Sequence, residues 1–222
     1  SFLYSLMFTR GLAYLYWNGS AWVDADGSGQ ESAMFYDTTV QSTSLALNES
    51  GRPIVVWTRG GPGEINYLYW NGLSWVDIDG VGQDEMVVFT NGIDQDFYGA
   101  NLALDNSNLP HLAWRVTASD EEYDIYYLYW NGFDWVDIDG VGQGSRIVWQ
   151  REIGFVLSFV LDEANNYPHF LAGRDGMGNG YLDYLEWWID ESTPSILPQT
   201  GSKLLILTIS RLLGLTDLKI RK

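Results

Sequence analysis

The feature that most constrains the fold is a 16-residue block that occurs three times. It spans residues 15–30 (LYWNGSAWVDADGSGQ), 68–83 and 128–143. The second and third copies are identical at 14 of 16 positions, and the first and second at 12 of 16. Identity this close, at offsets of 53 and 60 residues, is the signature of a repeat protein whose units stack on their neighbours.

Each complete unit holds four short segments with the pattern of β-strands. They are residues 43–47, 53–59, 65–70 and 85–90 in one unit, and 101–104, 110–116, 123–130 and 145–150 in the next. An Asn-Gly pair after the third segment indicates a tight turn with positive φ angles. The sequence therefore predicts an all-β, β-propeller-like fold with four-stranded antiparallel blades of about 55 residues.

The outer units are incomplete in sequence. The propeller-like domain is expected over residues 1–190, with blades at about 1–38, 43–90, 101–150 and 157–188, the first without its first strand and the last without its fourth. This amounts to about 3.5 blades, and since residue 1 is Ser rather than Met, we expect a fragment of a longer chain. Six side chains are expected to face the core between blades: Leu45, Leu47, Leu102, Leu104, Trp114 and Val160.

Charge argues against one class of partner. The chain carries a net charge of −17, and residues 1–201, which lack lysine, carry −21. Because such a body repels phosphate backbones, nucleic-acid binding is not expected. The chain contains no cysteine, so its stability does not depend on disulfides.

The strand patterns resemble bacterial repeat propellers related to the sialidase (Asp-box) and fucose-lectin families. The resemblance covers about residues 4–188 and rests on SLALNESGRPIVVW (44–57), NLALDNSNLPHLAW (101–114) and the YLYWNG block. It implies propeller strands and, through the sialidases, a possible glycoside hydrolase. The chain departs from the family because it has no true Asp-box motif in the expected loop.

The C-terminal segment resembles a sortase cell-wall sorting signal. After a polar linker at 191–196 come an LPQTG motif, an apolar run at 204–215 and a basic end, the whole spanning 197–222. The resemblance implies cleavage by sortase within the motif Leu197, Pro198, Gln199, Thr200, Gly201 and attachment to the cell wall, with the membrane met only through this tail. The apolar run is shorter than the roughly 20 residues of a membrane span.

The acidic loops suggest two interpretations. Paired carboxylates followed by Gly wrap hard cations, which makes calcium a possible ligand, although the further oxygen ligands of an EF-hand are missing. The alternative is an acidic connection between the third and fourth strands, with no cofactor. The pairs are Asp24/Asp26, Asp77/Asp79 and Asp137/Asp139.

Arginines recur at the end of the second strand of each unit, among them Arg59 and Arg115. Arginine grips carboxylates in a bidentate geometry, as on a sugar acid, but a repeated Arg in an acidic protein is more often a structural ion-pair partner. His111 and His169 are also repeat-equivalent, and we expect them to be part of the scaffold rather than catalytic.

Tryptophans are the main candidates for ligand contact, because an indole face suits a pyranose ring. Strand alternation predicts that the strand residues Trp17, Trp70 and Trp130 are buried in blade packing, and that the loop residues Trp22, Trp75 and Trp135 are partly exposed.

The expected function is a non-enzymatic, extracellular, cell-wall-anchored binding or adhesion module for glycans or surface polymers. Near-identical repeats suit multivalent binding, whereas catalysis needs a unique constellation of residues. The alternatives are a fragment of a sialidase-like glycoside hydrolase and a structural spacer.

Overall fold

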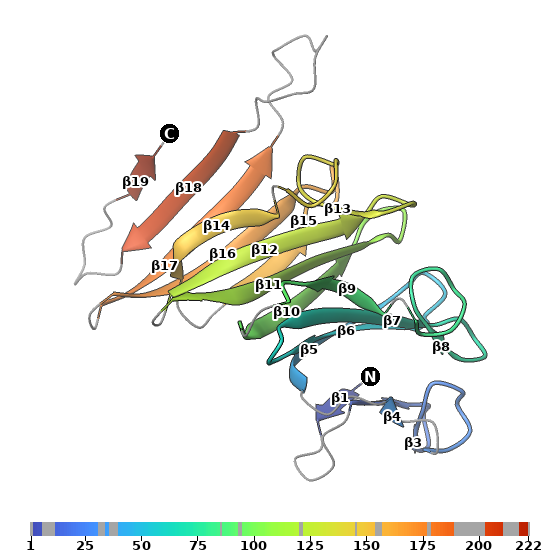
Figure 1. The fold of residues 1–222 in the computed structure, drawn as a ribbon. Coiled ribbons are helices and arrows are strands. Elements are labelled where there is room, and N and C mark those ends of the chain that lie inside the picture. The colour runs from blue at the N-terminus through green and yellow to red at the C-terminus, as the bar shows by residue number, and fades with distance from the viewer. Residues whose placement is uncertain are drawn as a thin grey trace.

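The computed structural model describes the chain in twelve segments and shows an all-β protein. They are residues 2–5, 12–30, 34–35, 40–84, 86–92, 95–119, 122–144, 146–153, 157–176, 179–188, 203–210 and 218–221. Within these segments every regular element is a β-strand, in four antiparallel sheets (Figure 1). This confirms the predicted fold class at the level of all-β; the propeller arrangement stays a prediction.

The two central units share one design. In the second unit, β5 (Val40–Leu47), β6 (Pro53–Arg59) and β7 (Glu64–Trp70) pair antiparallel in that order, and both β8 (Trp75–Val76) and β9 (Val87–Thr90) pair with β7. The third unit repeats this with β10 (Phe97–Leu104), β11 (Pro110–Ser119), β12 (Glu122–Trp130), β13 (Trp135–Val136) and β14 (Ile147–Ile153).

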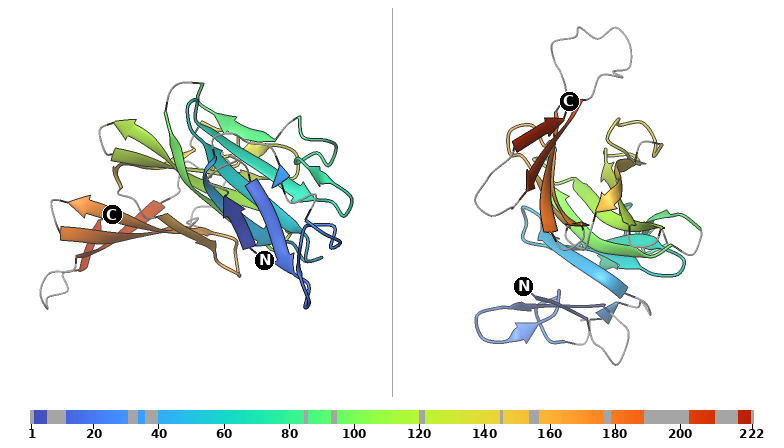
Figure 2. Two further views of the ribbon diagram at one scale, coloured as in Figure 1. Left: turned by 90° about the horizontal axis from the view of Figure 1, so that it is seen from below. Right: turned by 90° about the vertical axis from the view of Figure 1, so that its left-hand side faces the viewer.

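The outer units depart from this design in different ways: among the described residues, the first has no counterpart of β5, and the fourth has no counterpart of β8 but one added final strand. The first unit contains β1 (Phe2–Ser5), β2 (Leu12–Trp17), β3 (Trp22–Val23) and β4 (Met34–Phe35). The fourth contains β15 (Leu157–Leu161), β16 (Pro168–Gly176), β17 (Asn179–Trp188), β18 (Lys203–Ser210) and β19 (Leu218–Arg221). The main strands of the two central units lie close to the segments predicted from the sequence. Figure 2 shows the sheets from two further sides.

The repeated acidic loop interrupts the fourth strand instead of preceding it. Trp75 and Val76 already pair with Trp70 and Tyr69 at one end of β7, and β9 pairs with the other end, Glu64–Asn66. The residues between β8 and β9 therefore bulge out of the sheet. This placement holds both ends of the loop in hydrogen-bonded strand, so the loop is anchored on the sheet edge.

Both faces of the two central sheets are covered by neighbouring units. Because side chains alternate along a strand, successive residues pack against opposite neighbours. Between the first and second units lie Leu12, Tyr14, Val55, Trp57, Leu68, Trp70 and Trp75. Between the second and third lie Ile54, Val56, Ile65, Tyr67, Val88, Phe97, Ala100, Leu112, Trp114, Val116, Tyr126 and Leu128. Between the third and fourth lie Ala113, Ile125, Tyr127, Val148, Trp149, Phe159, Phe170 and Ala172. The units are therefore packed in series.

The prediction for inter-unit core residues is only partly confirmed. Trp114 is fully buried, and Leu45, Leu102 and Leu104 pack against the cores. The prediction is wrong for Leu47 and Val160, which are exposed. Alternation points Leu47 toward the first unit, where the described strands include no counterpart of β5, and points Val160 away from the third unit.

Part of the segment expected to carry the sorting signal forms strands. β18 pairs with β17 from Tyr181↔Ser210 to Trp188↔Lys203, which is the side of β17 that matches the position of β9 on β7. The expectation that the last unit lacks a fourth strand is therefore wrong, because residues beyond the linker supply that strand. The LPQTG motif, like the linker, lies outside the described residues, so its role stays a prediction. Within the described segments, no helix has the length and apolar character that a membrane crossing requires.

Candidate functional site

The candidate site is the loop rim, which we define as residues 18–30, 71–83 and 131–143. Each of these segments follows the third strand of its unit, and in Figure 1 all three lie in the right-hand half of the molecule. The rim contains most of the residues that are identical in all three copies of the repeat, and also the most exposed large apolar side chains of the described residues. Its geometry is built from three sets of hydrogen bonds.

The first set closes the hairpin after the third strand. The Oδ1 atom of Asn71 accepts the N–H groups of Leu73 and Ser74 at 2.9 and 3.0 Å, and the Asn71 N–H donates to the Ser74 carbonyl at 3.1 Å. The same bonds form at Asn18 and Asn131. Of the Asn-Gly pair only Gly has a positive φ, +105° at Gly72, so the predicted positive φ at Asn is wrong. Asn is needed because its side chain caps the turn.

The second set forms the acidic loop around a buried carboxylate. The Asp77 side chain is buried, and its Oδ1 accepts the Asp79 N–H at 3.3 Å, while the Asp79 Oδ1 accepts the Val81 N–H at 2.6 Å. Gly80 has φ +81°, and a Cβ there would lie 2.9 Å from the Tyr69 hydroxyl. Only glycine fits both the φ angle and the space. The carboxylates thus serve as acceptors that shape the loop.

The third set was not foreseen from the sequence. The Nε2 atom of Gln83 donates to the carbonyl of Trp75 at 3.1 Å, eight residues back, and so ties the end of the loop to its beginning. Gln30 and Gln143 make the same bond at 3.0 and 3.1 Å. The signal was present in the sequence, since Gln ends all three copies of the block. The loops are therefore three copies of one hydrogen-bonded framework.

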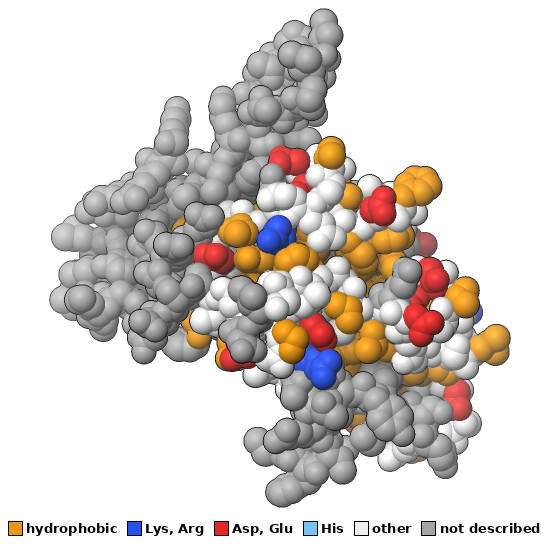
Figure 3. Space-filling model, viewed as in Figure 1, with side chains coloured by type: hydrophobic (Ala, Val, Ile, Leu, Met, Phe, Trp, Pro, Cys, Tyr) orange, Lys and Arg blue, Asp and Glu red, His pale blue; other side chains and the backbone are white. Residues whose placement is uncertain are grey.

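This framework holds large apolar side chains out in solvent. Leu73 and Phe133 are 89% and 85% exposed, and the loop residues Val81 and Val141 are nearly as open. Figure 3 shows apolar side chains next to acidic ones at the right-hand edge of the molecule. Exposed apolar side chains at the same two positions of two repeated loops make these loop tips candidate contact points. The sequence-based candidates did not include these residues.

The expected split between strand and loop tryptophans is confirmed only in part. Trp70 is buried and Trp135 partly exposed, as expected, but the split is wrong for Trp17 and Trp75. The loop residue Trp75 is 7% exposed and packs edge-on against Tyr14 of the preceding unit, with 5.7 Å between ring centroids. Trp135 meets Tyr67 in the same way at 5.6 Å. Trp22 is 42% exposed and Trp17 is also exposed, because they lie on the side of the first unit that faces away from the second. Burial therefore follows the neighbouring unit, not strand or loop position.

Replacing Trp75 with Ala is expected to lower the free energy of unfolding by about 3–5 kcal/mol, the usual cost of truncating a buried Trp. The repeat-equivalent change Trp22→Ala should cost about 1 kcal/mol or less, because much of that side chain remains in water. Urea denaturation of both variants in dilute solution measures the difference. Equal losses would contradict the inter-unit role of Trp75.

The two candidate arginines are not equivalent in the structure. Arg59 ends β6 and forms an ion pair with Glu64, 3.2 Å from Nη1 to Oε2. Arg115 lies within β11, is buried, and stacks over the ring of Tyr123 at 5.1 Å; burial lowers its pKa. Trp57 and Trp114 hold the same position in the repeat. Arg59 lies two residues after Trp57, whereas Arg115 directly follows Trp114, so the two arginines lie on opposite faces of their sheets.

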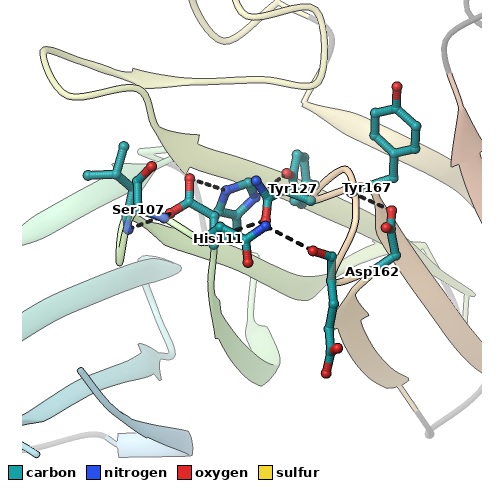
Figure 4. A network of polar contacts seen from close by, with 10 residues as sticks. Ser107, His111, Tyr127, Asp162 and Tyr167 are labelled. Atoms are coloured by element: carbon teal, nitrogen blue, oxygen red, sulfur yellow. Dashed lines mark hydrogen bonds and ion pairs between the residues drawn. The ribbon is translucent and has the colours of Figure 1, made fainter. Parts of the chain in front are cut away.

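A buried polar chain holds His111 in the third unit (Figure 4). The His111 Nδ1 lies 2.6 Å from the Tyr127 hydroxyl, and its Nε2 lies 3.8 Å from Oδ2 of Asp105. Burial raises the pKa of Tyr127 well above its usual range, so the hydroxyl stays protonated and donates a hydrogen bond to Nδ1. Burial also lowers the pKa of His111 to about 4, so the imidazole is neutral at pH 7. His111 is out of reach of a substrate, as its expected scaffold role requires.

Calcium binding at the acidic loops stays a prediction. In each loop the first carboxylate is buried and accepts a loop N–H, while the second points outward. The described part of the chain holds no cluster of three or more acidic, histidine or cysteine side chains suited to a metal ion. If calcium does bind, chelation should lower the melting temperature.

The rim thus offers rigid loops with exposed apolar tips and outward carboxylates. No family model, curated protein or solved structure matches this chain.

Proposed function

We propose that the protein is a non-enzymatic, propeller-type binding module that holds neutral surface polysaccharides or related polymers through its loop rim. A single observation carries the proposal: two loops with the same hydrogen-bonded framework each expose two large apolar side chains. The four residues are Leu73, Val81, Phe133 and Val141. Leaving such groups in water forgoes their burial, so a contact function explains their placement.

The chemistry of the rim suits sugars. The flat ring of Phe133 can lie on the C–H face of a pyranose, and the outward carboxylates of Asp79 and Asp139 can accept hydroxyl hydrogens. The net charge of −17 disfavours sialylated or sulfated polymers and favours neutral ones. Two or more similar loops on one scaffold gain from effective concentration, so clustered ligands would be held much more firmly than free sugars.

The first unit supplies the substitutions for the test. It has the same framework but carries Ser20 where the other loops have Leu73 and Phe133, and Ser28 where they have Val81 and Val141. Serine is therefore compatible with the loop. The variant Leu73→Ser/Val81→Ser/Phe133→Ser/Val141→Ser removes the apolar tips and keeps the hydrogen bonds of Asn71 and Asp77.

We expect this variant to lose retention in affinity electrophoresis through gels that contain neutral polysaccharides, and in pull-down with insoluble cell-wall material. Changing one loop alone should already weaken binding to the polymer by about 100-fold, since multivalent gains are of that size. The control is Val87→Ser, which removes an exposed apolar side chain outside the rim. Undiminished binding by the four-residue variant, or no binding of the parent to any neutral polymer, would refute the proposal.

A further inference from the structure

One contact joins the first unit to the second and the second to the third. The loop Trp of one unit meets the third-strand Tyr of the preceding unit, at 5.7 Å for Trp75 on Tyr14 and at 5.6 Å for Trp135 on Tyr67. The interplanar angles, 73° and 68°, are also close. These two junctions thus share one interface with two different sides, a Trp side and a Tyr side.

Turns between the first and second strands join the units a second time. The Oδ1 atom of Asn108 in the third unit accepts the N–H of Glu49 in the second at 3.0 Å. Asn166 of the fourth unit accepts the N–H of Asn106 in the third at 3.1 Å. Both asparagines have φ 61°, so the same strained turn makes the same bond twice. The interface is therefore specific in its polar as well as its apolar contacts.

The first unit leaves its Trp side open. We call this surface the head face and define it by Leu15, Trp17 and Trp22, which hold the repeat positions of Leu68, Trp70 and Trp75. In the second unit all three of these positions are buried against the first unit. On the head face Leu15 is only partly buried, and Trp17 and Trp22 are exposed. Two adjacent exposed tryptophans, 5.9 Å apart, form a large apolar surface.

The fourth unit leaves its Tyr side open. We call this surface the tail face and define it by Val160 and Leu171, which are 58% and 38% exposed. The strand registers equate Leu171 with Ala113 of the third unit, which is fully buried against the fourth. Leu171 pairs in register with Tyr184, the sequence counterpart of Tyr67 and Tyr127. The side that is buried between units elsewhere is thus exposed in the fourth unit at these two described apolar side chains.

We propose that the head face of one chain docks on the tail face of a second copy of the same chain. The two faces are the two halves of the interface that the chain forms internally, and every copy carries both. Because the faces differ, the contact is heterologous and leads to a closed ring or an open series of copies. The proposal rests on the packing between units and not on the loop rim.

Charge sets the conditions for association. Each copy carries −17, so two copies repel one another at low ionic strength. Salt screens this repulsion and strengthens the apolar contact. We therefore expect the association to tighten as sodium chloride is added, the opposite of an association driven by opposite charges.

Sedimentation equilibrium of the chain over a range of protein and salt concentrations tests the proposal. The mass should rise above 25.1 kDa with concentration. The head variant Trp17→Ser/Trp22→Ser and the tail variant Val160→Glu/Leu171→Glu should each weaken self-association about tenfold or more, as truncation of central aromatic anchors does. Leu73→Ser removes an even more exposed apolar side chain outside both faces and should leave self-association unchanged. Circular dichroism verifies that the variants remain folded.

A mixture of the head and tail variants separates the proposed geometry from its rivals. The head variant keeps an intact tail face and the tail variant an intact head face, so the mixture should form a dimer that neither variant forms alone. Self-association of the head variant at the parental strength would overturn the proposal. So would a mixture that forms no dimer, or a tail variant that self-associates at the parental strength, which indicates head-to-head pairing. A parent that stays monomeric at every salt concentration would overturn it too, as when another repeat of a longer chain is the natural occupant.

Discussion

Replacing Trp114 with Ala is expected to lower the free energy of unfolding by about 3–5 kcal/mol. Trp114 is fully buried between the second and third units, where its ring lies 5.6–6.0 Å from those of Phe89, Phe97 and Tyr126. Its removal leaves a cavity that the two sheets cannot close without shifting strands. The loss is a large share of the 5–15 kcal/mol typical of a whole domain.

Urea denaturation followed by far-UV circular dichroism measures this loss, and the melting temperature should fall by about 10 °C. Phe133→Ala is the matched control, because it removes an aromatic ring that is 85% exposed and should change stability by less than about 0.5 kcal/mol. A loss below about 1 kcal/mol for Trp114→Ala would contradict the existence of a shared core between the two sheets.

The strands could be predicted from the sequence because their signals are local. Pro53 and Pro110 mark the first residues of β6 and β11, and β6 begins and ends at the predicted residues. β-branched and aromatic residues between turn signals indicate strands whatever surrounds them. The split of the fourth strand was less accessible, since only the pairing of Trp75 with Trp70 shows that the sheet resumes before the loop.

Burial of the tryptophans could not be predicted, because it depends on the neighbouring unit. Trp22 and Trp75 occupy the same position in blocks of nearly identical sequence, yet only Trp75 has another unit packed over it. Alternation within a strand distinguishes the two faces of a sheet but not which face is covered. The exposed Leu73 and Phe133 could not be predicted either, since the block varies at this position and the repeat signal lies in its constant residues.

Stability is expected to fall by about 3 kcal/mol as the pH drops from 6.5 to about 4, through the titration of His111 alone. In the folded chain burial lowers the pKa of this imidazole to about 4, although the nearby Asp105 carboxylate opposes the shift. In the unfolded chain the imidazole has its ordinary pKa of 6.5. Between pH 6.5 and about 4 it therefore binds a proton in the unfolded state but stays neutral in the folded state. The unfolded state therefore gains in this window, and the contribution is complete above it.

The second unit provides the control for the pH dependence, since it has Asn48 and Ile54 where the third has Asp105 and His111. The variant Asp105→Asn/His111→Ile copies that pair and cannot titrate there. Its baseline stability will change because the Tyr127 hydroxyl loses its acceptor, so the quantity to compare is the slope of the unfolding free energy against pH. The parent should be steeper than the variant between pH 4 and 6.5, by up to about 1.4 kcal/mol for each pH unit. Equal slopes for the two proteins would mean that His111 is open to water in the folded protein. They would contradict the burial of His111 between Asp105 and Tyr127.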